Sequence, residues 1–278
     1  MELNHKIGIG TAQFGMKYGI SNMKGKTPIS QVTNILSLAK RRGVIYIDTA
    51  SAYGNAEKVL GLCNLDGFRI VSKFMPPVDL SITDQLNKTL QDLNVPMLYG
   101  YMAHRPSVLN DDTYWVELLH LKNLGKMSKI GYSANSIDEV NFLLDEKKIP
   151  DIIQLPFNYF DNRFEDIITK LKSRGTEIHI RSVFLQGLFF ADIKLLSDFF
   201  NPVKKTLQEL QDNYKERLPS ILLKYALSMK FIDVVIMGVE DEFQLKNNLE
   251  NIGLVELINN YKECQSELIL NPSNWPKK

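Results

Sequence analysis

Short runs of apolar residues alternate with longer amphipathic segments along almost the whole chain. Between the apolar runs, apolar positions recur at helical spacing, as in residues 30–43, 82–94, 136–148 and 164–175. Several of these segments have Ser or Asp near the start and Gly or basic residues near the end, where helices are capped. The apolar runs have the length and composition of buried strands, and they cover residues 6–13, 44–50, 68–74, 97–104, 129–134, 151–158, 177–184 and 234–239. This alternation predicts βα units around a parallel sheet.

The number of units favours one closed barrel over two smaller domains. The seventh connection is long and holds two helix-like segments, residues 202–218 and 219–230. No linker rich in Pro, Gly or Ser divides the 278 residues. We therefore predict an α/β fold of the (β/α)8 TIM-barrel type, with a single domain over residues 1–278.

A doubly wound sheet is the main alternative architecture. It requires a phosphate-binding G-x-G-x-x-G loop after the first strand, followed at once by a helix. The stretch "GIGTAQFG" has Gln13 where the third glycine belongs, and we expect no helix directly after it. The alternative is therefore disfavoured.

Four titratable residues lie at or just after the ends of neighbouring predicted strands. Asp48, Lys73 and His104 end the second, third and fourth strands, and Tyr53 lies in the loop after the second. In a barrel the carboxyl ends of the strands share one face, where active sites are built. A nearby ammonium group lowers the pKa of a tyrosine, and a buried aspartate holds the lysine charged. The four residues predict a proton-transfer site acting on an oxygen atom, with His104 orienting the substrate or helping to pass the proton.

Each of these residues, taken alone, has an ordinary structural explanation as a strand end or loop residue. Their shared position at one face is what favours chemistry. The other histidines, His5, His120 and His179, lack such company and are expected to be structural or exposed. No His-x-His pair is present, so we expect no metal site.

The composition of the chain mainly argues against certain classes of partner and location. The 33 basic and 32 acidic residues balance, and neither a nucleic-acid nor a membrane partner is indicated. The start of the chain lacks the features of a signal peptide, and no apolar run reaches the roughly 18 residues that span a bilayer. Cys63 and Cys264 lie far apart and outside any CxxC motif, which suits a reducing compartment. We expect a cytoplasmic protein that acts on small molecules.

The motifs of this chain resemble those of the aldo-keto reductase superfamily, in the same order and over nearly the whole length. They read "GIGTAQFG", "IDTASAYGNAE", "VSKF", "AHRP", "KIGYSAN", "QLPFN", "RSVFLQGL" and "VIMGVEDEFQLKNNL". The resemblance implies a barrel that reduces an aldehyde or ketone, including sugar-like carbonyl compounds, with NADP(H) or NAD(H). It also implies that Tyr53 protonates the carbonyl oxygen, assisted by Lys73, Asp48 and His104.

The resemblance further implies which residues bind the cofactor and the substrate. Ser133 and Gln154 are placed against the nicotinamide carboxamide, the "RSVFLQGL" loop along the pyrophosphate, and "GVEDEFQLKNN" around the adenosine half. The implied cofactor-binding residues are Thr11, Asp48, Ser133, Gln154, Arg181, Ser182, Gln186, Gly187, Gly238, Val239, Glu240, Gln244, Asn247 and Asn248. The residues expected at the substrate are Phe14, Tyr53, Phe74, His104 and Asn158, although aromatic residues near strand ends also serve as core.

Two positions depart from the pattern of the family. Arg181 stands where many members have an aromatic residue that stacks on the nicotinamide; a guanidinium plane stacks too, but it carries a charge. Ala134 occupies a place that is often Asn, so an amide contact to the cofactor is either missing or supplied by Asn135.

The choice of dinucleotide stays open at this point. Three acids, Glu240, Asp241 and Glu242, would repel a 2′-phosphate and favour NAD(H). Against this, Lys246 and Gln244 follow within about a helical turn, where their side chains could reach the phosphate. The resemblance to the family also favours NADP(H).

Two other functions also remain open: a redox-silent regulatory subunit that binds the dinucleotide, and a redox-neutral enzyme that modifies sugars with the same cofactor. No motif specifies the physiological substrate, because substrate loops on this kind of barrel vary freely.

Overall fold

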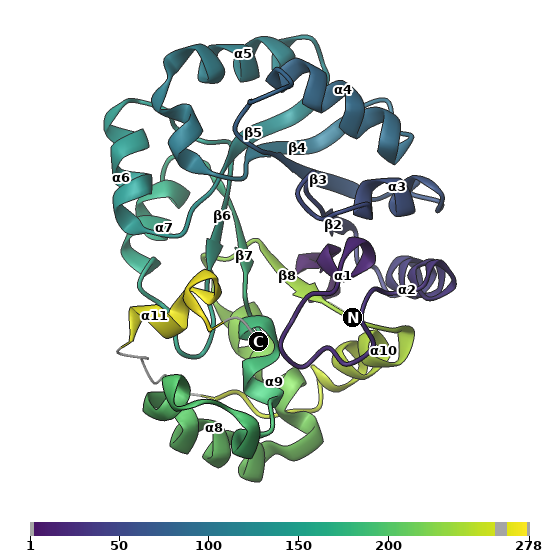
Figure 1. Ribbon diagram of the computed structural model, residues 1–278, viewed down its shortest axis with the longest axis vertical. Helices are drawn as coiled ribbons and strands as arrows, with labels where there is room; N and C mark the ends of the chain where they lie inside the picture. The colour runs from purple at the N-terminus through teal and green to yellow at the C-terminus, as the bar shows by residue number, and fades with distance from the viewer. Residues whose placement is uncertain (1–2, 259–265, 277–278) are drawn as a thin grey trace.

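The computed structural model describes residues 3–258 and 266–276 and has the predicted closed barrel (Figure 1). The strands follow chain order, each parallel to its neighbours, and β8 pairs with β1 to close the ring. A doubly wound sheet is thereby excluded. The strands are β1 Ile7–Gly10, β2 Tyr46–Asp48, β3 Arg69–Phe74, β4 Leu98–Ala103, β5 Met127–Ser133, β6 Ile152–Pro156, β7 Glu177–Arg181 and β8 Val234–Gly238.

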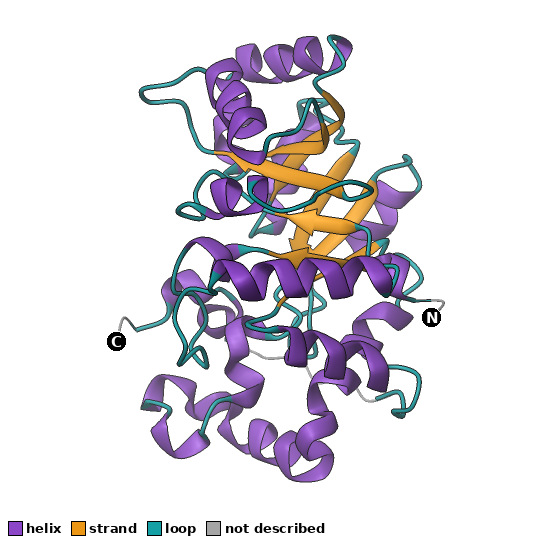
Figure 2. Ribbon diagram, turned by 90° about the vertical axis from the view of Figure 1, so that its right-hand side faces the viewer, coloured by secondary structure: helices purple, strands orange, loops and turns teal. Residues whose placement is uncertain are grey.

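Helices flank the strands on the outside of the barrel (Figures 1 and 2). They are α1 Ala12–Gly15, α2 Ile29–Arg41, α3 Ala56–Gly61, α4 Ile82–Leu93, α5 Asp112–Asn123, α6 Ile137–Asp145, α7 Glu165–Lys172, α8 Asn201–Tyr214, α9 Leu218–Ser228, α10 Glu242–Asn251 and α11 Glu267–Leu270. Short 3-10 helices include η2 Pro106–Asn110 and η3 Leu185–Phe190.

The predicted helix boundaries are close to the observed ones. At the start of α6, Ser136 and Glu139 form a reciprocal capping box that satisfies backbone donors of the first turn. The long seventh connection holds two helices, α8 and α9, as expected. One expectation was wrong: a single-turn helix, α1, does follow the first strand directly, because Phe14 is buried there and holds the chain against the barrel.

Apolar residues fill the space between the strands and the surrounding helices, and a second apolar cluster joins α8, α9, η3 and the segment around Trp275. In the described ranges, no helix has both the length and the apolar character needed to cross a bilayer. Cys63 is a half-buried free thiol, whereas Cys264 lies outside the described residues. The described residues also hold no cluster of three or more metal-ligating side chains.

Candidate active site

A buried ion pair joins the second and third strands at their carboxyl ends. Lys73 Nζ donates to Asp48 Oδ1 at 2.7 Å and to the Thr49 carbonyl oxygen at 2.9 Å. Gln154 Nε2, from β6, donates to the other carboxylate oxygen of Asp48 at 2.8 Å. Burial lowers the pKa of the Lys73 ammonium, and the charge and hydrogen bond of Asp48 oppose that shift. Asp48 is thus fixed by two donors, and Lys73 by two acceptors.

Tyr53 lies next to this pair and borders a cavity. Its ring centroid is 5.1 Å from Lys73 Nζ, and its ring meets that of His104 edge-on at 5.7 Å. We expected Lys73 to lower the pKa of Tyr53, but the net shift of that pKa is upward. Burial and the negative charge of Asp48 raise that pKa, and the positive charge of Arg181 opposes them. The Lys73 ammonium donates its hydrogen bonds to Asp48 and to the Thr49 carbonyl oxygen. The phenol is therefore protonated at neutral pH, the form in which it can act as an acid.

His104 follows β4 and is neutral over the physiological range. Burial lowers its pKa to about 3, and the positive charges of Lys73, Arg181 and Arg105 act in the same direction. Its Nδ1 atom is buried and has no hydrogen-bond partner among the described residues. A neutral imidazole with a free ring nitrogen can orient a substrate oxygen, but it carries no proton to spare near pH 7.

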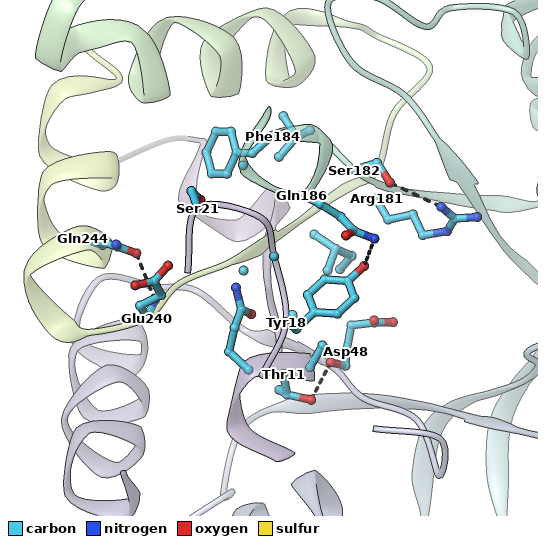
Figure 3. A pocket seen from close by; sticks show the side chains of 18 of the residues that line it. Thr11, Tyr18, Ser21, Asp48, Arg181, Ser182, Phe184, Gln186, Glu240 and Gln244 are labelled. Carbon is cyan, nitrogen blue, oxygen red and sulfur yellow. Dashed lines mark hydrogen bonds between the residues drawn. The ribbon is translucent and has the colours of Figure 1, made fainter. Parts of the chain in front are cut away.

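The cavity beside Tyr53 has a volume of about 400 Å³, and its lining includes residues at the carboxyl ends of strands. Figure 3 shows it from close by. Most of the residues expected at the cofactor line it, including those expected near opposite ends of a dinucleotide. They are Thr11, Asp48, Gln154, Arg181, Ser182, Gln186, Gly187, Gly238, Glu240, Gln244 and Asn248.

Three other residues expected at the cofactor are absent from the described lining of this cavity. Ser133 is 3% exposed, and its hydroxyl lies 3.5 Å from the side-chain oxygen Oε1 of Gln154, which lines the cavity. Val239 is fully buried in the core, and Asn247 is half-buried on α10.

The residues expected at the substrate divide into two groups. Tyr53 borders the cavity, and His104 contacts Tyr53. Phe14 and Phe74 are fully buried core residues, and Asn158 is 1% exposed; none of the three belongs to the described lining of the cavity. Burial is typical of core packing for Phe14 and Phe74, and the substrate contacts of these three residues stay a prediction.

A segment that sequence reasoning missed, residues 16–28, contacts the loop after β7 at the edge of the cavity (Figure 3). The Ile20 N–H donates to the Gln186 carbonyl oxygen at 2.9 Å, and Gln186 Nε2 donates to the Tyr18 hydroxyl at 3.0 Å. Gly187 has φ of +88°, and a Cβ there would lie 2.0 Å from Ser21 Oγ, so only glycine fits. The length of this segment is the signal in the sequence that could have revealed it, because long connections without helical or strand periodicity are often functional.

The guanidinium of Arg181 is held by neutral acceptors. Its Nη2 atom donates to Asn135 Oδ1 at 2.6 Å and to the Ala134 carbonyl oxygen at 3.1 Å, and its Nη1 atom to Ser182 Oγ at 3.3 Å. Within the described residues, no carboxylate oxygen lies within 4.0 Å of its nitrogens. The Asn135 side-chain oxygen is therefore committed to Arg181.

The three acids at the start of α10 point in different directions. Asp241 pairs with Lys24 at 2.6 Å and caps α10 by accepting from the Gln244 N–H. Glu242 lies 3.5 Å from Arg41. Only Glu240 lines the cavity, so one acid rather than three faces a bound molecule.

Comparison with known proteins decides the family. The sequence profile of the aldo/keto reductase family matches residues 6–265. The chain belongs to the aldo/keto reductase family. As a member of that family, it is an NAD(P)-dependent oxidoreductase that acts on carbonyl compounds.

Individual relatives agree with this assignment. The chain is 27% identical over 239 residues to the NAD/NADP-dependent indole-3-acetaldehyde reductase of Schizosaccharomyces pombe, covering 82% of this chain and 78% of that one. Among solved structures, aldo-keto reductase AKR11C1 from Bacillus halodurans, in its holo form, matches with a TM-score of 0.73 and 17% identity, covering 91% of this chain and 88% of that one. That likeness supports the barrel fold of this aldo/keto reductase.

Proposed function

We propose that this aldo/keto reductase reduces an aldehyde or ketone to an alcohol, with Tyr53 as the general acid. The observation that carries the proposal is the buried Asp48–Lys73 pair at 2.7 Å, lying beside the one phenol that borders the cavity from the loop after β2. The proposal assigns Lys73 the stabilisation of the phenolate that forms and Asp48 the retention of the Lys73 charge. His104 orients the carbonyl oxygen with its neutral ring.

The raised pKa of Tyr53 suits the reductive direction. A protonated phenol polarises a carbonyl as it hydrogen-bonds to the oxygen, and it transfers its proton as the oxygen becomes an alkoxide. An alkoxide is a far stronger base than a phenolate, so a high phenol pKa does not prevent the transfer. The phenolate then lies near two cations, Lys73 and Arg181, which favour the charged form until solvent returns a proton.

The cavity suits a nicotinamide dinucleotide. At one end, Gln154 presents an amide beside Asp48 and Tyr53; at the other, Gln244 and Glu240 lie at the start of α10. Gly187 and Gly238 keep side-chain atoms out of the space between loops, since a Cβ on Gly238 would lie 2.7 Å from Gln13 Oε1. When bound, the cofactor supplies a hydride to the carbonyl carbon.

We assign Glu240 the discrimination between the two dinucleotides. A carboxylate at the cavity wall accepts hydrogen bonds from ribose hydroxyls and repels a 2′-phosphate. Asp241 contributes little to this discrimination because Lys24 neutralises its charge. The same ion pair makes Lys24 less able to bind a phosphate group. The proposal is therefore NAD(H) in preference to NADP(H), with use of both retained as in the NAD/NADP-dependent yeast relative.

A panel of carbonyl compounds with NADH and NADPH tests the function. The panel should include sugar-like aldehydes and ketones and indole-3-acetaldehyde, which the yeast relative reduces according to its name. For at least one substrate, we expect the absorbance of the reduced cofactor to fall, with one mole of alcohol formed for each mole of NADH or NADPH oxidised. Substrate conversion with no net loss of absorbance would point instead to redox-neutral chemistry, and cofactor binding without any conversion would point to a regulatory role.

A further inference from the structure

Arg181 brings a positive charge to the part of the cavity where Tyr53 lies. Both residues line the same cavity, and the Arg181 charge acts on the Tyr53 phenol. An arginine side chain stays protonated in proteins, so this charge is permanent. Burying it is costly unless an anion is close.

No such anion is close in the described structure. The nearest hydrogen-bond partners are the neutral oxygens of Asn135, Ala134 and Ser182. Asp48 and Asp161 act on Arg181 only from beyond ion-pair distance, and Asp48 is already paired with Lys73. The three acceptors fix the guanidinium in place, so it cannot turn away from a charge that develops in the cavity.

We infer that Arg181 makes this protein bind the reduced nicotinamide cofactor more tightly than the oxidised one, and thereby speeds release of the oxidised cofactor after each turnover. This inference rests on the proposed function. When hydride passes to the carbonyl carbon and Tyr53 gives its proton to the oxygen, the nicotinamide ring changes from neutral to positively charged. The fixed Arg181 cation repels the positively charged nicotinamide ring of the oxidised cofactor but not the neutral ring of the reduced one.

The effect is confined to the nicotinamide end, because the adenosine half is identical in the two redox forms. A cation near Glu240 at the other end of the cavity therefore changes the affinity for both forms equally. Lys24 is such a cation, since it pairs with Asp241 at 2.6 Å next to Glu240. It offers a matched control for charge removal.

The test is the ratio of the dissociation constants for NAD+ and NADH, measured by titration of the purified protein and its variants. We expect a ratio of roughly tenfold or more in the unmodified protein. Arg181→Gln keeps amide donors for Ala134 and Asn135 but removes the charge, and its ratio should fall toward one. Arg181→Lys keeps the charge and should keep most of the ratio. Lys24→Met should leave the ratio unchanged.

Equal affinities for NAD+ and NADH in the unmodified protein would overturn the inference, whatever the variants do. So would an unchanged ratio in a folded Arg181→Gln protein; if its KM for anionic carbonyl compounds rose instead, the charge would serve the substrate. Should Arg181→Gln not fold, the unmodified protein and Arg181→Lys still decide. Failure of both redox forms to bind would overturn the proposed function together with this inference, whereas equal binding with normal turnover would overturn this inference alone.

Discussion

The two ends of the barrel both bury charged side chains, but they use them differently. At the carboxyl ends of the strands, Asp48 and Lys73 lie beside a cavity, with Tyr53 at its border. At the amino ends, Glu177 accepts hydrogen bonds from Tyr99 at 2.6 Å and from His179 at 2.7 Å and pairs with Lys129 at 2.7 Å.

The two ends differ in whether their charged groups already have partners. Glu177 accepts from His179 of its own strand and interacts with Tyr99 of β4 and Lys129 of β5, so its charge stabilises contacts between separate strands of the barrel. Near Asp48, by contrast, the Arg181 cation lines the cavity and lacks a close counter-ion within the part of the chain described here. A buried histidine Nδ1 atom without a hydrogen-bond partner occurs at both ends, in His104 and in His179. A carboxylate surrounded by donors stabilises a fold, whereas a charge that lacks a counter-ion at a cavity is ready for a ligand.

The largest effect is expected from Lys73→Met. This change leaves Asp48 buried without its cation, which destabilises a protein by about 3 to 5 kcal/mol. It also removes the charge that stabilises the Tyr53 phenolate, so kcat should fall by at least about 10²-fold. Denaturant unfolding and steady-state kinetics measure the two effects. Lys129→Met is the control at the other end: its partly exposed pair with Glu177 should cost about 1 kcal/mol or less and leave kcat unchanged.

Glu177→Gln should affect stability in a pH-dependent way and leave the chemistry alone. Burial raises the pKa of Glu177, but the hydrogen bonds from His179, Lys129 and Tyr99, together with the charge of His179, outweigh it and lower the pKa to about 2. A depressed carboxyl pKa contributes stability that is fully present above the ordinary value of 4.5 and is lost as the pH falls toward 2.

The unfolding free energy of Glu177→Gln should therefore lie below that of the unmodified protein at pH 7, by about 1 to 3 kcal/mol. The gap should close between pH 4.5 and 2. Urea unfolding over this range measures it. A gap that stays constant with pH would show that the carboxylate charge is not what the network stabilises.

His104 should give a smaller, kinetic effect. With a pKa of about 3, the imidazole stays neutral from pH 5 to 8, so kcat/KM should show no inflection from this residue near pH 6.5. Loss of one orienting hydrogen bond in His104→Gln should lower kcat/KM by about tenfold at most. An inflection near pH 6.5 that disappears in His104→Gln would show that the residue is protonated during turnover.

The smallest effect concerns the choice of cofactor. Glu240→Arg should raise the affinity for NADPH relative to NADH by about tenfold or less, because a guanidinium binds the 2′-phosphate where a carboxylate repels it. Glu242→Arg makes the same charge change next to Arg41 and should shift the preference less. Titrations with both cofactors at low and moderate salt compare the two variants. Equal shifts would mean that only the overall charge matters.

The strands of the barrel and the residues at their carboxyl ends were predicted from the sequence better than the loops that follow them. The barrel follows from alternating strand and helix periodicity, and the contact between Asp48 and Lys73 follows from the rule that strand ends share a face. The partners of Arg181 did not follow, because Ala134 and Asn135 come from the loop after β5. The loop after β7 was not predictable either, because Ser182, Leu185 and Gln186 have positive φ there. Neither period nor composition predicts such conformations in residues other than glycine.

The aromatic residues illustrate a second limit. Phe14 and Phe74 lie close to strand ends, which made them candidates for the substrate pocket, yet both are fully buried in the core. Near a strand end, successive side chains point to opposite faces, and a short run does not reveal which face is the cavity. The network around Glu177 was missed for a related reason: Tyr99, Lys129 and Glu177 are far apart in sequence and read singly as strand residues.

The central claim is that chemistry resides at one end of the barrel and structural charge at the other, and two matched substitutions test it most directly. Tyr53→Phe and Tyr99→Phe each remove one phenolic oxygen, one from each end. We predict that Tyr53→Phe lowers kcat by about 10²- to 10⁴-fold with little change in unfolding free energy or NADH binding. Tyr99→Phe should lose the hydrogen bond to Glu177, lower the unfolding free energy by about 1.5 to 3 kcal/mol, and keep its kcat. Full turnover by Tyr53→Phe, measured as NADH oxidation coupled to alcohol formation, would contradict the account.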